Sequence, residues 1–225
     1  MNTIIFHDLG LKDFKETWDF QEVLFSQMLP GENEPSVGGH LIFVEHPHVF
    51  TLGRSGNEGN LLINEAMLKM KGAQFYRINR GGDITYHGPG QVVGYPIIRL
   101  DRFEMGIRSY IEYLEETIIR TLQKYGIQSG RLLGASGVWL DSDKPEARKI
   151  CAIGVRASRQ VTMHGFAFNV NTDLSFYQLI NPCGFVDKGV TSMQKELGRP
   201  VDMAELKAIL LEKFKEVFRA EDISF

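Results

Sequence analysis

Residues 80–91 read Arg-Gly-Gly-Asp-Ile-Thr-Tyr-His-Gly-Pro-Gly-Gln. This stretch gathers four glycines, a proline, two ring side chains, an arginine and an acid. Gly81 and Gly82 allow a close approach of the backbone to a ligand, and Gly88-Pro89-Gly90 is typical of a tight turn. The stretch therefore predicts a loop, a short strand and a turn with a ligand against them. A plain glycine-rich hairpin is the alternative interpretation.

Around this stretch the bulk composition indicates one globular unit. The chain has 225 residues, 43% of them hydrophobic, which is enough for one sizeable core. We expect a single α/β domain over residues 1–225. The 25 Lys and Arg against 28 Asp and Glu argue against a sequence-independent nucleic-acid binder.

The compartment follows from what the N-terminal stretch and the cysteines suggest. Residues 1–14 show no charged region followed by an apolar run, and no stretch approaches the length of a membrane span. We expect a cytoplasmic protein with no membrane partner. Cys151 and Cys183 are too few for a disulfide framework and are expected to be free thiols.

The hydrophobic pattern predicts helices alternating with strands. Apolar residues at helical spacing predict helices over 14–28, 64–72, 106–125 and 191–197, and a last one that begins at Asp202. Apolar and β-branched runs predict strands at 4–6, 40–44, 74–78, 92–98, 132–133, 137–140, 149–157, 161–163 and 166–170. We expect the opening stretch to connect neighbouring strands at the end of one sheet.

The two cysteines have different surroundings in the sequence. Cys183 lies between Pro182 and Gly184, where a loop would leave its thiol accessible, whereas Cys151 lies in an apolar strand and is expected to be a buried small hydrophobe. A nucleophilic thiol needs a nearby cation that favours the thiolate, and the sequence offers Lys149 and His164. A lysine held in solvent at a strand end is the alternative for Lys149.

Two further features bear on the site. Residues 163–171 combine His164 with small residues and with Phe166 and Phe168, a pattern that suits the wall of an apolar slot, although an ordinary sheet strand could look the same. His46 and His48 flank a proline, but no third and fourth ligand follows at a recognisable spacing, so we expect no metal.

Four segments, in this order, resemble the lipoyl(octanoyl) transferase family, also called lipoate-protein ligase B. They are residues 80–91, 149–155, 164–167 and 181–184, and residues 44–53 resemble an early segment of the same family. The resemblance covers roughly residues 40 to 190. It implies the fold of biotin protein ligases and lipoate-protein ligase A, which is mixed β-sheets flanked by helices.

The resemblance also implies an activity without a cofactor. Such an enzyme moves an octanoyl group from octanoyl-acyl carrier protein to a lysine of apo-lipoyl domains. The acceptors implied are 2-oxoacid dehydrogenase E2 subunits and the glycine-cleavage H protein, in the first step of protein lipoylation.

By the same resemblance, Cys183 is the acyl-thioester nucleophile and Lys149 the residue that lowers its pKa. The implied substrate-lining residues are Arg80, Gly81, Gly82, Asp83, Ile84, Thr85, Tyr86, His87, Ala152, Ile153, Gly154, Gly165, Phe166 and Ala167. Two positions depart from the family pattern: Asp83 stands where glutamine is expected, and Cys151 where alanine or serine is expected.

The chemistry expected is a two-step acyl transfer. The Cys183 thiolate attacks the octanoyl thioester, and the acceptor lysine then attacks the acyl-enzyme with Lys149 as its base. Backbone N–H groups near Gly184 or in the 80–82 loop are candidate oxyanion donors. Exchange of one thioester for another is nearly balanced, so no ATP is needed.

Three other functions are weighed against this one. An ATP-dependent lipoate or biotin ligase has no use for a nucleophilic thiol, and the sequence shows no Walker-type loop. A non-catalytic acyl-binding protein and a cysteine hydrolase are the other two. We expect a monomer, with Arg54, Arg156, Arg159 and Lys188 as candidates for a basic rim that faces an acidic carrier.

Overall fold

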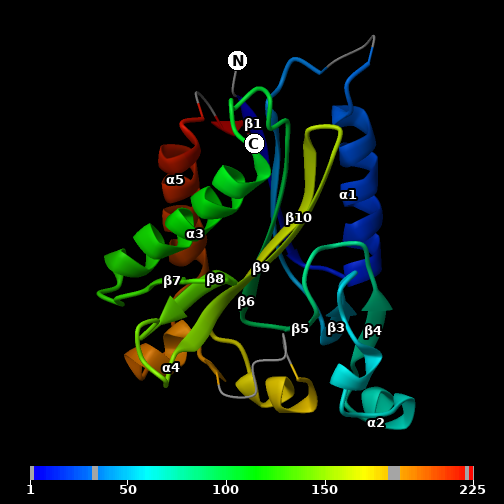
Figure 1. Ribbon diagram of the computed structural model, residues 1–225, viewed down its shortest axis with the longest axis vertical. Coiled ribbons are helices and arrows are strands. Elements are labelled where there is room, and N and C mark those ends of the chain that lie inside the picture. The colour runs from blue at the N-terminus through cyan, green and yellow to red at the C-terminus, as the bar shows by residue number, and fades with distance from the viewer. Residues whose placement is uncertain (1–2, 32–34, 182–187, 221–222, 225) are drawn as a thin grey trace.

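The computed structural model describes residues 3–31, 35–181, 188–220 and 223–224. Cys183 lies outside these residues. The described chain folds into a large sheet and a small sheet with helices on both sides of the large one (Figure 1). This arrangement confirms the predicted mixed α/β fold.

The large sheet contains nine strands among the described residues. They are β1 (Ile4–Leu11), β2 (Gly39–Glu45), β6 (Gln91–Ile98), β7 (Gly130–Leu132), β8 (Ala135–Leu140), β9 (Arg148–Ser158), β10 (Val161–Asn169), β11 (Gly189–Val190) and β12 (Ile223–Ser224). Their order is β12-β1-β2-β6-β10-β9-β8-β7, and β11 pairs with β9. β1 is parallel to β2 and β12, and β11 is parallel to β9, whereas the other pairs are antiparallel.

The small sheet corrects one prediction. It consists of β4 (Gln74–Arg77), β3 (Val49–Leu52) and β5 (Ile84–His87), in that order. The loop, strand and turn predicted for residues 80–91 are present, but β4 before them and β6 after them belong to different sheets. The prediction that they are neighbours was wrong, because strand partners are chosen by long-range pairing that the local sequence does not encode. The stretch instead carries the chain from one sheet to the other.

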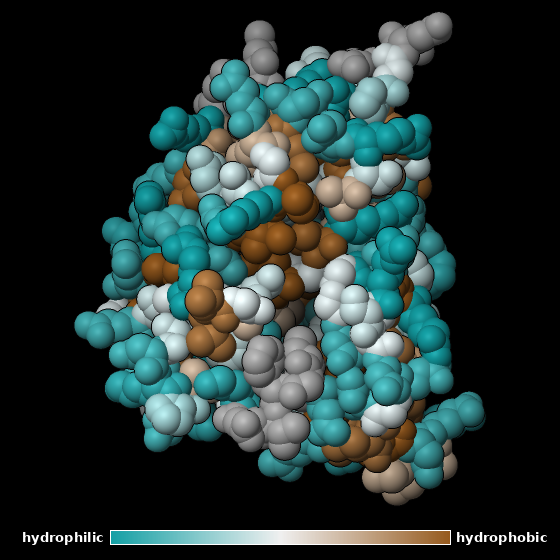
Figure 2. Space-filling view, in the orientation of Figure 1, coloured by the Kyte–Doolittle hydropathy of each residue, from teal (hydrophilic) through white to brown (hydrophobic). Residues whose placement is uncertain are grey.

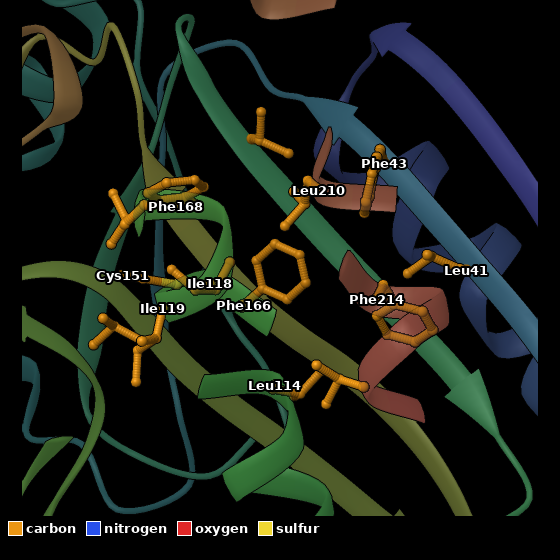
Figure 3. Packing of buried hydrophobic residues seen from close by; sticks show 14 of the residues in the cluster. Leu41, Phe43, Leu114, Ile118, Ile119, Cys151, Phe166, Phe168, Leu210 and Phe214 are labelled. Atoms are coloured by element: carbon orange, nitrogen blue, oxygen red, sulfur yellow. The ribbon is translucent and has the colours of Figure 1, made fainter. Parts of the chain in front are cut away.

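One face of the large sheet is covered by α3 (Ile107–Lys124) and α5 (Met203–Phe218). The predicted stripe of α3 lies in the core, where Leu114, Ile118 and Leu122 are fully buried. Phe166 and Phe168 of β10 meet these helices (Figure 3). Phe168 is therefore part of this core and does not form the slot wall that the sequence predicted.

The opposite face is covered by α1 (Phe14–Met28), which packs on β6 and β10. Leu24, Phe25 and Met28 of α1 lie against Val93 and Tyr95. Shorter elements complete the described chain: α2 (Glu65–Met70), α4 (Met193–Leu197) and the 3₁₀ turns η1 (Glu58–Asn60) and η2 (Leu174–Leu179). No helix in the described ranges is long and apolar enough to cross a bilayer.

Candidate active site

A cleft lies between the large sheet and the small sheet and encloses about 910 Å³, its open mouth included. Figure 2 shows the molecule hollowed in the middle, with apolar residues exposed above the hollow. Twelve of the predicted substrate-lining residues line the cleft: Arg80, Gly82, Asp83, Ile84, Thr85, His87, Ala152, Ile153, Gly154, Gly165, Phe166 and Ala167. Lys149 lines it as well. The cleft thus combines small and apolar wall residues with a cationic side chain.

Two predicted lining residues lie elsewhere. Tyr86 is fully buried in the core of the small sheet, where its hydroxyl is 2.7 Å from Nδ1 of His48 and its ring stacks on Phe176. Gly81 instead joins the two sheets, since its N–H donates to the carbonyl of Val155 on β9 at 2.9 Å. Both residues therefore support the cleft from outside its surface.

Arg80 is held by the small sheet and by the glycine beneath it. Its Nη2 donates to the carbonyl of Thr51 at 2.6 Å, and its Nη1 donates to the carbonyl of Gly81 at 3.0 Å. A Cβ on Gly154 would lie 2.9 Å from Gly81 O, closer than Cβ atoms come to a backbone oxygen, and 3.1 Å from Arg80 Cδ, which is a tight contact. A methyl group at position 154 would therefore force the Arg80 loop to shift where it crosses β9.

A chain of hydrogen bonds fixes His87 at the inner wall. Its Nδ1 lies 2.9 Å from Gln91 Oε1, which only accepts, so Nδ1 carries the proton. Its Nε2 lies 3.4 Å from the Thr51 hydroxyl, which in turn accepts from Arg80. Burial lowers the pKa of His87 to about 3. His87 is therefore neutral with both nitrogens engaged, which makes it a structural member of the wall.

Gln91 extends this chain to the far side of the site. Its amide Nε2 donates to Asn169 Oδ1 at 2.9 Å and to the Tyr177 hydroxyl at 3.2 Å. Asn169 Nδ2 then donates to the carbonyl of Thr191 at 3.1 Å. The network thus runs from the small sheet, through β10, to the segment that follows β11.

Three more histidines can be placed. His164 lines the cleft in a left-handed backbone conformation (φ 61°) and bonds Asn79 at 2.8 Å. Burial lowers its pKa to about 3. His46 bonds Tyr95 and the carbonyl of Lys12, and His48 bonds Tyr86. Among the described residues no group of His, Cys, Asp and Glu is arranged to hold a metal ion.

A β-bulge aims Lys149 into the cleft. Val138 pairs with Cys151, but the next residue of β8, Trp139, pairs with Lys149, so β9 carries one extra residue at Ile150. Both Ile150 and Cys151 consequently point into the core beneath α3. Without the bulge, strict alternation of side chains from Ala152 would point Lys149 away from the cleft. The extra residue at Ile150 brings the Lys149 side chain back to the cleft side of β9. Its ammonium lies 4.6 Å from the centre of the Trp139 ring.

The chain enters and leaves residues 182–187 through well-bonded neighbours. Asn181 N–H donates to the carbonyl of Asn60 at 2.8 Å, and Asn60 Nδ2 donates to Asp83 Oδ2 at 2.5 Å. On the other side, β11 pairs with β9 at Arg148 and Lys149. Asp83, the departure from the family pattern, therefore bonds the residue that anchors one end of this segment.

The second departure, Cys151, is buried as predicted. It is fully buried among core residues below α3, and burial raises the pKa of its thiol. A raised pKa leaves the thiol protonated at neutral pH, which does not suit a nucleophile.

The predicted basic residues do not form one rim. Lys188 lines the cleft, and Arg54 is exposed beside the Arg80 loop, where its N–H donates to Arg80 O. Arg156 instead packs its guanidinium over Phe25 and pairs with Glu22 of α1. Arg159 lies in the turn between β9 and β10.

Several residues that line the cleft were not predicted from the sequence: Phe14, Ile78, Val93, Tyr95, Trp139, Asn169, Tyr177, Gly189 and Val190. Most are apolar or aromatic residues in helices and strands, and such residues are indistinguishable by sequence from ordinary core. Asn169 was the exception that could have been found, because a polar residue that ends an apolar strand needs a buried partner.

Comparison with known proteins adds to this geometry. The model of the lipoyl protein ligase A/B catalytic domain matches residues 13–215. A protein of Christiangramia forsetii named octanoyltransferase is 54% identical over 222 residues, which cover 95% of each chain. A protein of Bacteroides fragilis with the same name is 55% identical over 201 residues, which cover 89% of this chain and 91% of the other.

Solved structures share the fold at low identity. The bipartite lipoate protein ligase of Thermoplasma acidophilum superposes with a TM-score of 0.77 at 17% identity, covering 100% of this chain and 86% of that one. Biotin protein ligase from Aquifex aeolicus, solved with biotin and ATP, superposes with a TM-score of 0.53 at 14% identity, covering 97% and 70%. The fold expected from the four segments is thus confirmed.

Proposed function

The chain belongs to the lipoyl protein ligase A/B catalytic-domain family, and from this membership we propose how it carries out octanoyl transfer in protein lipoylation. The relatives named octanoyltransferase match nearly its whole length at more than half identity. The donor is octanoyl-acyl carrier protein, and the acceptor is a lysine of an apo-lipoyl domain or of the H protein.

The observation that carries the proposal is the position of Lys149 in the cleft. Its side chain lines an otherwise largely apolar slot. The residue also pairs with Val190 of β11, seven positions after Cys183 in the sequence. A cation beside an apolar slot suits a thiolate that carries an alkyl group. We therefore assign Cys183 as nucleophile and Lys149 as the residue that stabilises its thiolate.

In the first step the Cys183 sulfur attacks the thioester carbonyl. A new S–C bond forms and the bond to the carrier sulfur breaks. The Lys149 ammonium gives its proton to that sulfur, so the carrier leaves as a thiol and Lys149 is left neutral. The octanoyl chain occupies the slot walled by Ala152 and Ala167. The small side chains at these positions leave width for an unbranched chain.

In the second step the acceptor lysine attacks the acyl-enzyme. It must arrive as the neutral amine although its free pKa is near 10.4, and Lys149 takes the proton that it loses. An N–C bond forms and the Cys183 sulfur leaves. Trp139 supports the ammonium form of Lys149 through its ring face, and this is the form that stabilises the Cys183 thiolate.

The test is intact mass after incubation with octanoyl-acyl carrier protein in the absence of ATP. We expect the wild-type protein to gain one octanoyl group that hydroxylamine removes and that an apo-lipoyl domain discharges. Cys183→Ser should gain none, whereas Cys151→Ala should gain it as the wild type does, because Cys151 is buried.

Two outcomes would overturn the assignment. An adduct that is lost only with Cys151→Ala would move the nucleophile to that cysteine. Octanoylation of the lipoyl domain that needs ATP and proceeds in Cys183→Ser would instead favour a ligase that works through an acyl-adenylate.

A further inference from the structure

Gly137 lies against the bulge that aims Lys149. Its φ is 115°, and a Cβ at this position would lie 2.4 Å from Cys151 O and 3.6 Å from Lys149 Cδ. Gly137 therefore leaves no room for a side chain beside the carbonyl of Cys151, and the stem of Lys149 lies close by. A displacement of Gly137 would disturb the bulge that directs Lys149.

Gly137 is held from the far side of the sheet by Glu115 of α3. Glu115 is only 6% exposed, and its Oε1 accepts the N–H of Gly137 at 2.9 Å. A carboxylate buried in this way fixes a backbone donor that would otherwise be unsatisfied, and hydrogen bonds to charged groups are the stronger ones.

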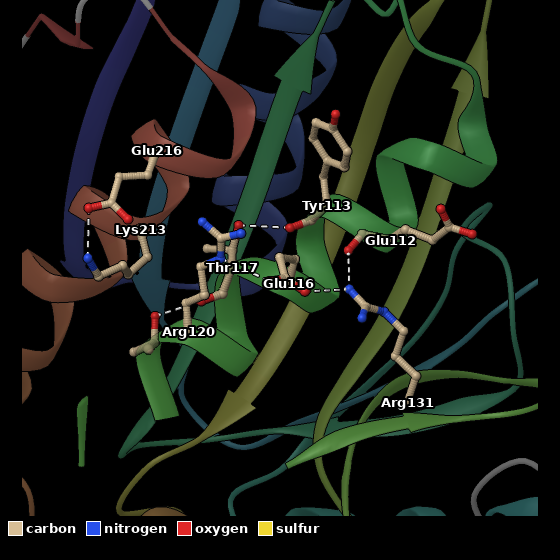
Figure 4. A network of polar contacts seen from close by, with 9 residues as sticks. Glu112, Tyr113, Glu116, Thr117, Arg120, Arg131, Lys213 and Glu216 are labelled. Atoms are coloured by element: carbon tan, nitrogen blue, oxygen red, sulfur yellow. Dashed lines mark hydrogen bonds and ion pairs between the residues drawn. The ribbon is translucent and has the colours of Figure 1, made fainter. Parts of the chain in front are cut away.

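Arg131 fixes Glu115 in turn. Its Nε donates to Glu115 Oε2 at 2.9 Å. Its Nη2 donates to the carbonyl of Glu112 and to Glu116 Oε2, also at 2.9 Å (Figure 4). Both oxygens of the buried carboxylate are thus engaged. One oxygen faces the guanidinium at the surface, and the other faces the strand that carries the bulge.

We propose that Glu115 is a positioning residue for Lys149, acting through Gly137 and the bulge at Ile150. Glu115 does not line the cleft and touches neither substrate in this arrangement. Its effect is on the direction in which the lysine points. The consequence for catalysis rests on the proposed role of Lys149, but the positioning itself does not.

The kinetic test compares substitutions along α3. Glu115→Ala should slow octanoyl loading by on the order of tenfold to a hundredfold, because small displacements of a reacting group have costs of this size. KM for the carrier should stay unchanged. Glu115→Gln should recover most of the rate, since an amide oxygen also accepts from Gly137. Glu116→Ala is the matched control: it removes another partner of Arg131 without touching Gly137, and its loading rate should be that of the wild type.

A second test needs no activity. In a Trp18→Phe background, Trp139 is the remaining tryptophan, and its emission senses the ammonium over its ring. The spectral change caused by Lys149→Met should be present when Glu115 is intact and largely lost in Glu115→Ala. If Glu115→Ala does not fold, Glu115→Asp shortens the side chain by one methylene and carries the same comparisons.

The outcomes separate this inference from the proposed function. If Lys149→Met is inactive while Glu115→Ala loads at the wild-type rate and keeps the full spectral change, the positioning role is wrong. If Lys149→Met loads and discharges normally, the proposed role of Lys149 is wrong, and the spectral comparison alone decides whether Glu115 positions it.

Discussion

Gly154 is the residue at which the Arg80 loop crosses β9. The absence of a side chain there lets the arginine lie flat against the strand, where it bonds Thr51 and reaches the chain of partners that ends at Thr191. The absence of a methyl group thus keeps the Arg80 loop in the position from which it completes the inner wall of the cleft.

Gly154→Ala should therefore displace the Arg80 loop. The added methyl group lies 2.9 Å from Gly81 O, so backbone must move, and we expect a loss of about 1–3 kcal/mol in the free energy of unfolding. Octanoyl loading should fall at least tenfold. Gly130→Ala in β7 is the matched control, because its methyl group would meet Ser142 Oγ at 3.4 Å, an ordinary contact. Wild-type loading in Gly154→Ala would contradict the role given to this crossing.

Residues of this kind can be selected from the sequence when their chemistry is rare. Arg80, His87 and Gly154 occur in segments that resemble a known family, and all three line the cleft. Trp139 and Glu115 could not be found in this way, since an aromatic in a strand and an acid on a helix are common. Their roles arise only when β8, β9 and α3 are packed together.

At the scale of elements, the site depends on the end of β9. At Arg148 and Lys149, β9 pairs with β8 on one side and with β11 on the other. From Cys151 onward, β10 takes the place of β11 as the partner on that second side. Asn169, the last residue of β10, bonds the carbonyl of Thr191 and so connects the end of β10 to the residue that follows β11.

Asn169→Ala should loosen this junction. It leaves the carbonyl of Thr191 without its side-chain partner, which costs about 1–3 kcal/mol in the free energy of unfolding. Gln91 loses one bond but keeps those to the Tyr177 hydroxyl and to the carbonyl of Tyr86. We expect a parallel loss of octanoyl loading, because β11 pairs beside Lys149. Urea unfolding and the loading rate measure the two effects.

Asn171→Ala is the control for that change. Asn171 bonds the N–H and carbonyl of Val201 at 2.9 and 2.8 Å, away from the cleft, so its loss should lower stability and spare the rate. Equal losses of rate in the two variants would show that Asn169 matters only for stability.

Element boundaries were predictable, but partners were not. The helical stripes and apolar runs place α1, α3 and α5 correctly, because periodicity is a local property. The prediction that β4 and β6 are neighbours in one sheet was wrong, and the bulge at Ile150 was not predicted. Both features depend on which strand pairs with which, and the local sequence does not show this.

At the scale of the whole molecule, buried histidines link stability to pH. Burial lowers the pKa of His40 and His46 to about 4 and that of His87 and His164 to about 3, against 6.5 in an unfolded chain. Below pH 6.5 these histidines bind protons in the unfolded chain but stay neutral in the folded chain. Stability is therefore complete above pH 6.5 and is lost as pH falls toward about 4.

Urea unfolding at pH 7.5, 6.0 and 5.0 measures how much the free energy of unfolding falls with pH. Each neutral buried histidine contributes a loss of up to about 1.4 kcal/mol per pH unit within that window. His164→Asn should reduce the fall of the unfolding free energy with pH by the contribution of one histidine, up to about 1.4 kcal/mol per pH unit. A free energy of unfolding that stays constant from pH 6.5 to 5.0 would mean that these imidazoles accept protons without unfolding.

The antiparallel pairing of β6 with β10 brings Gly94 to Phe166, residues that are far apart in the chain. Closing so long a loop loses conformational entropy before any contact offsets it, which slows folding. The floor of the cleft is built on this pair, whereas the helices that cover the sheet form from local contacts. We therefore expect a newly made chain to form its helices early and its acyl-binding cleft late.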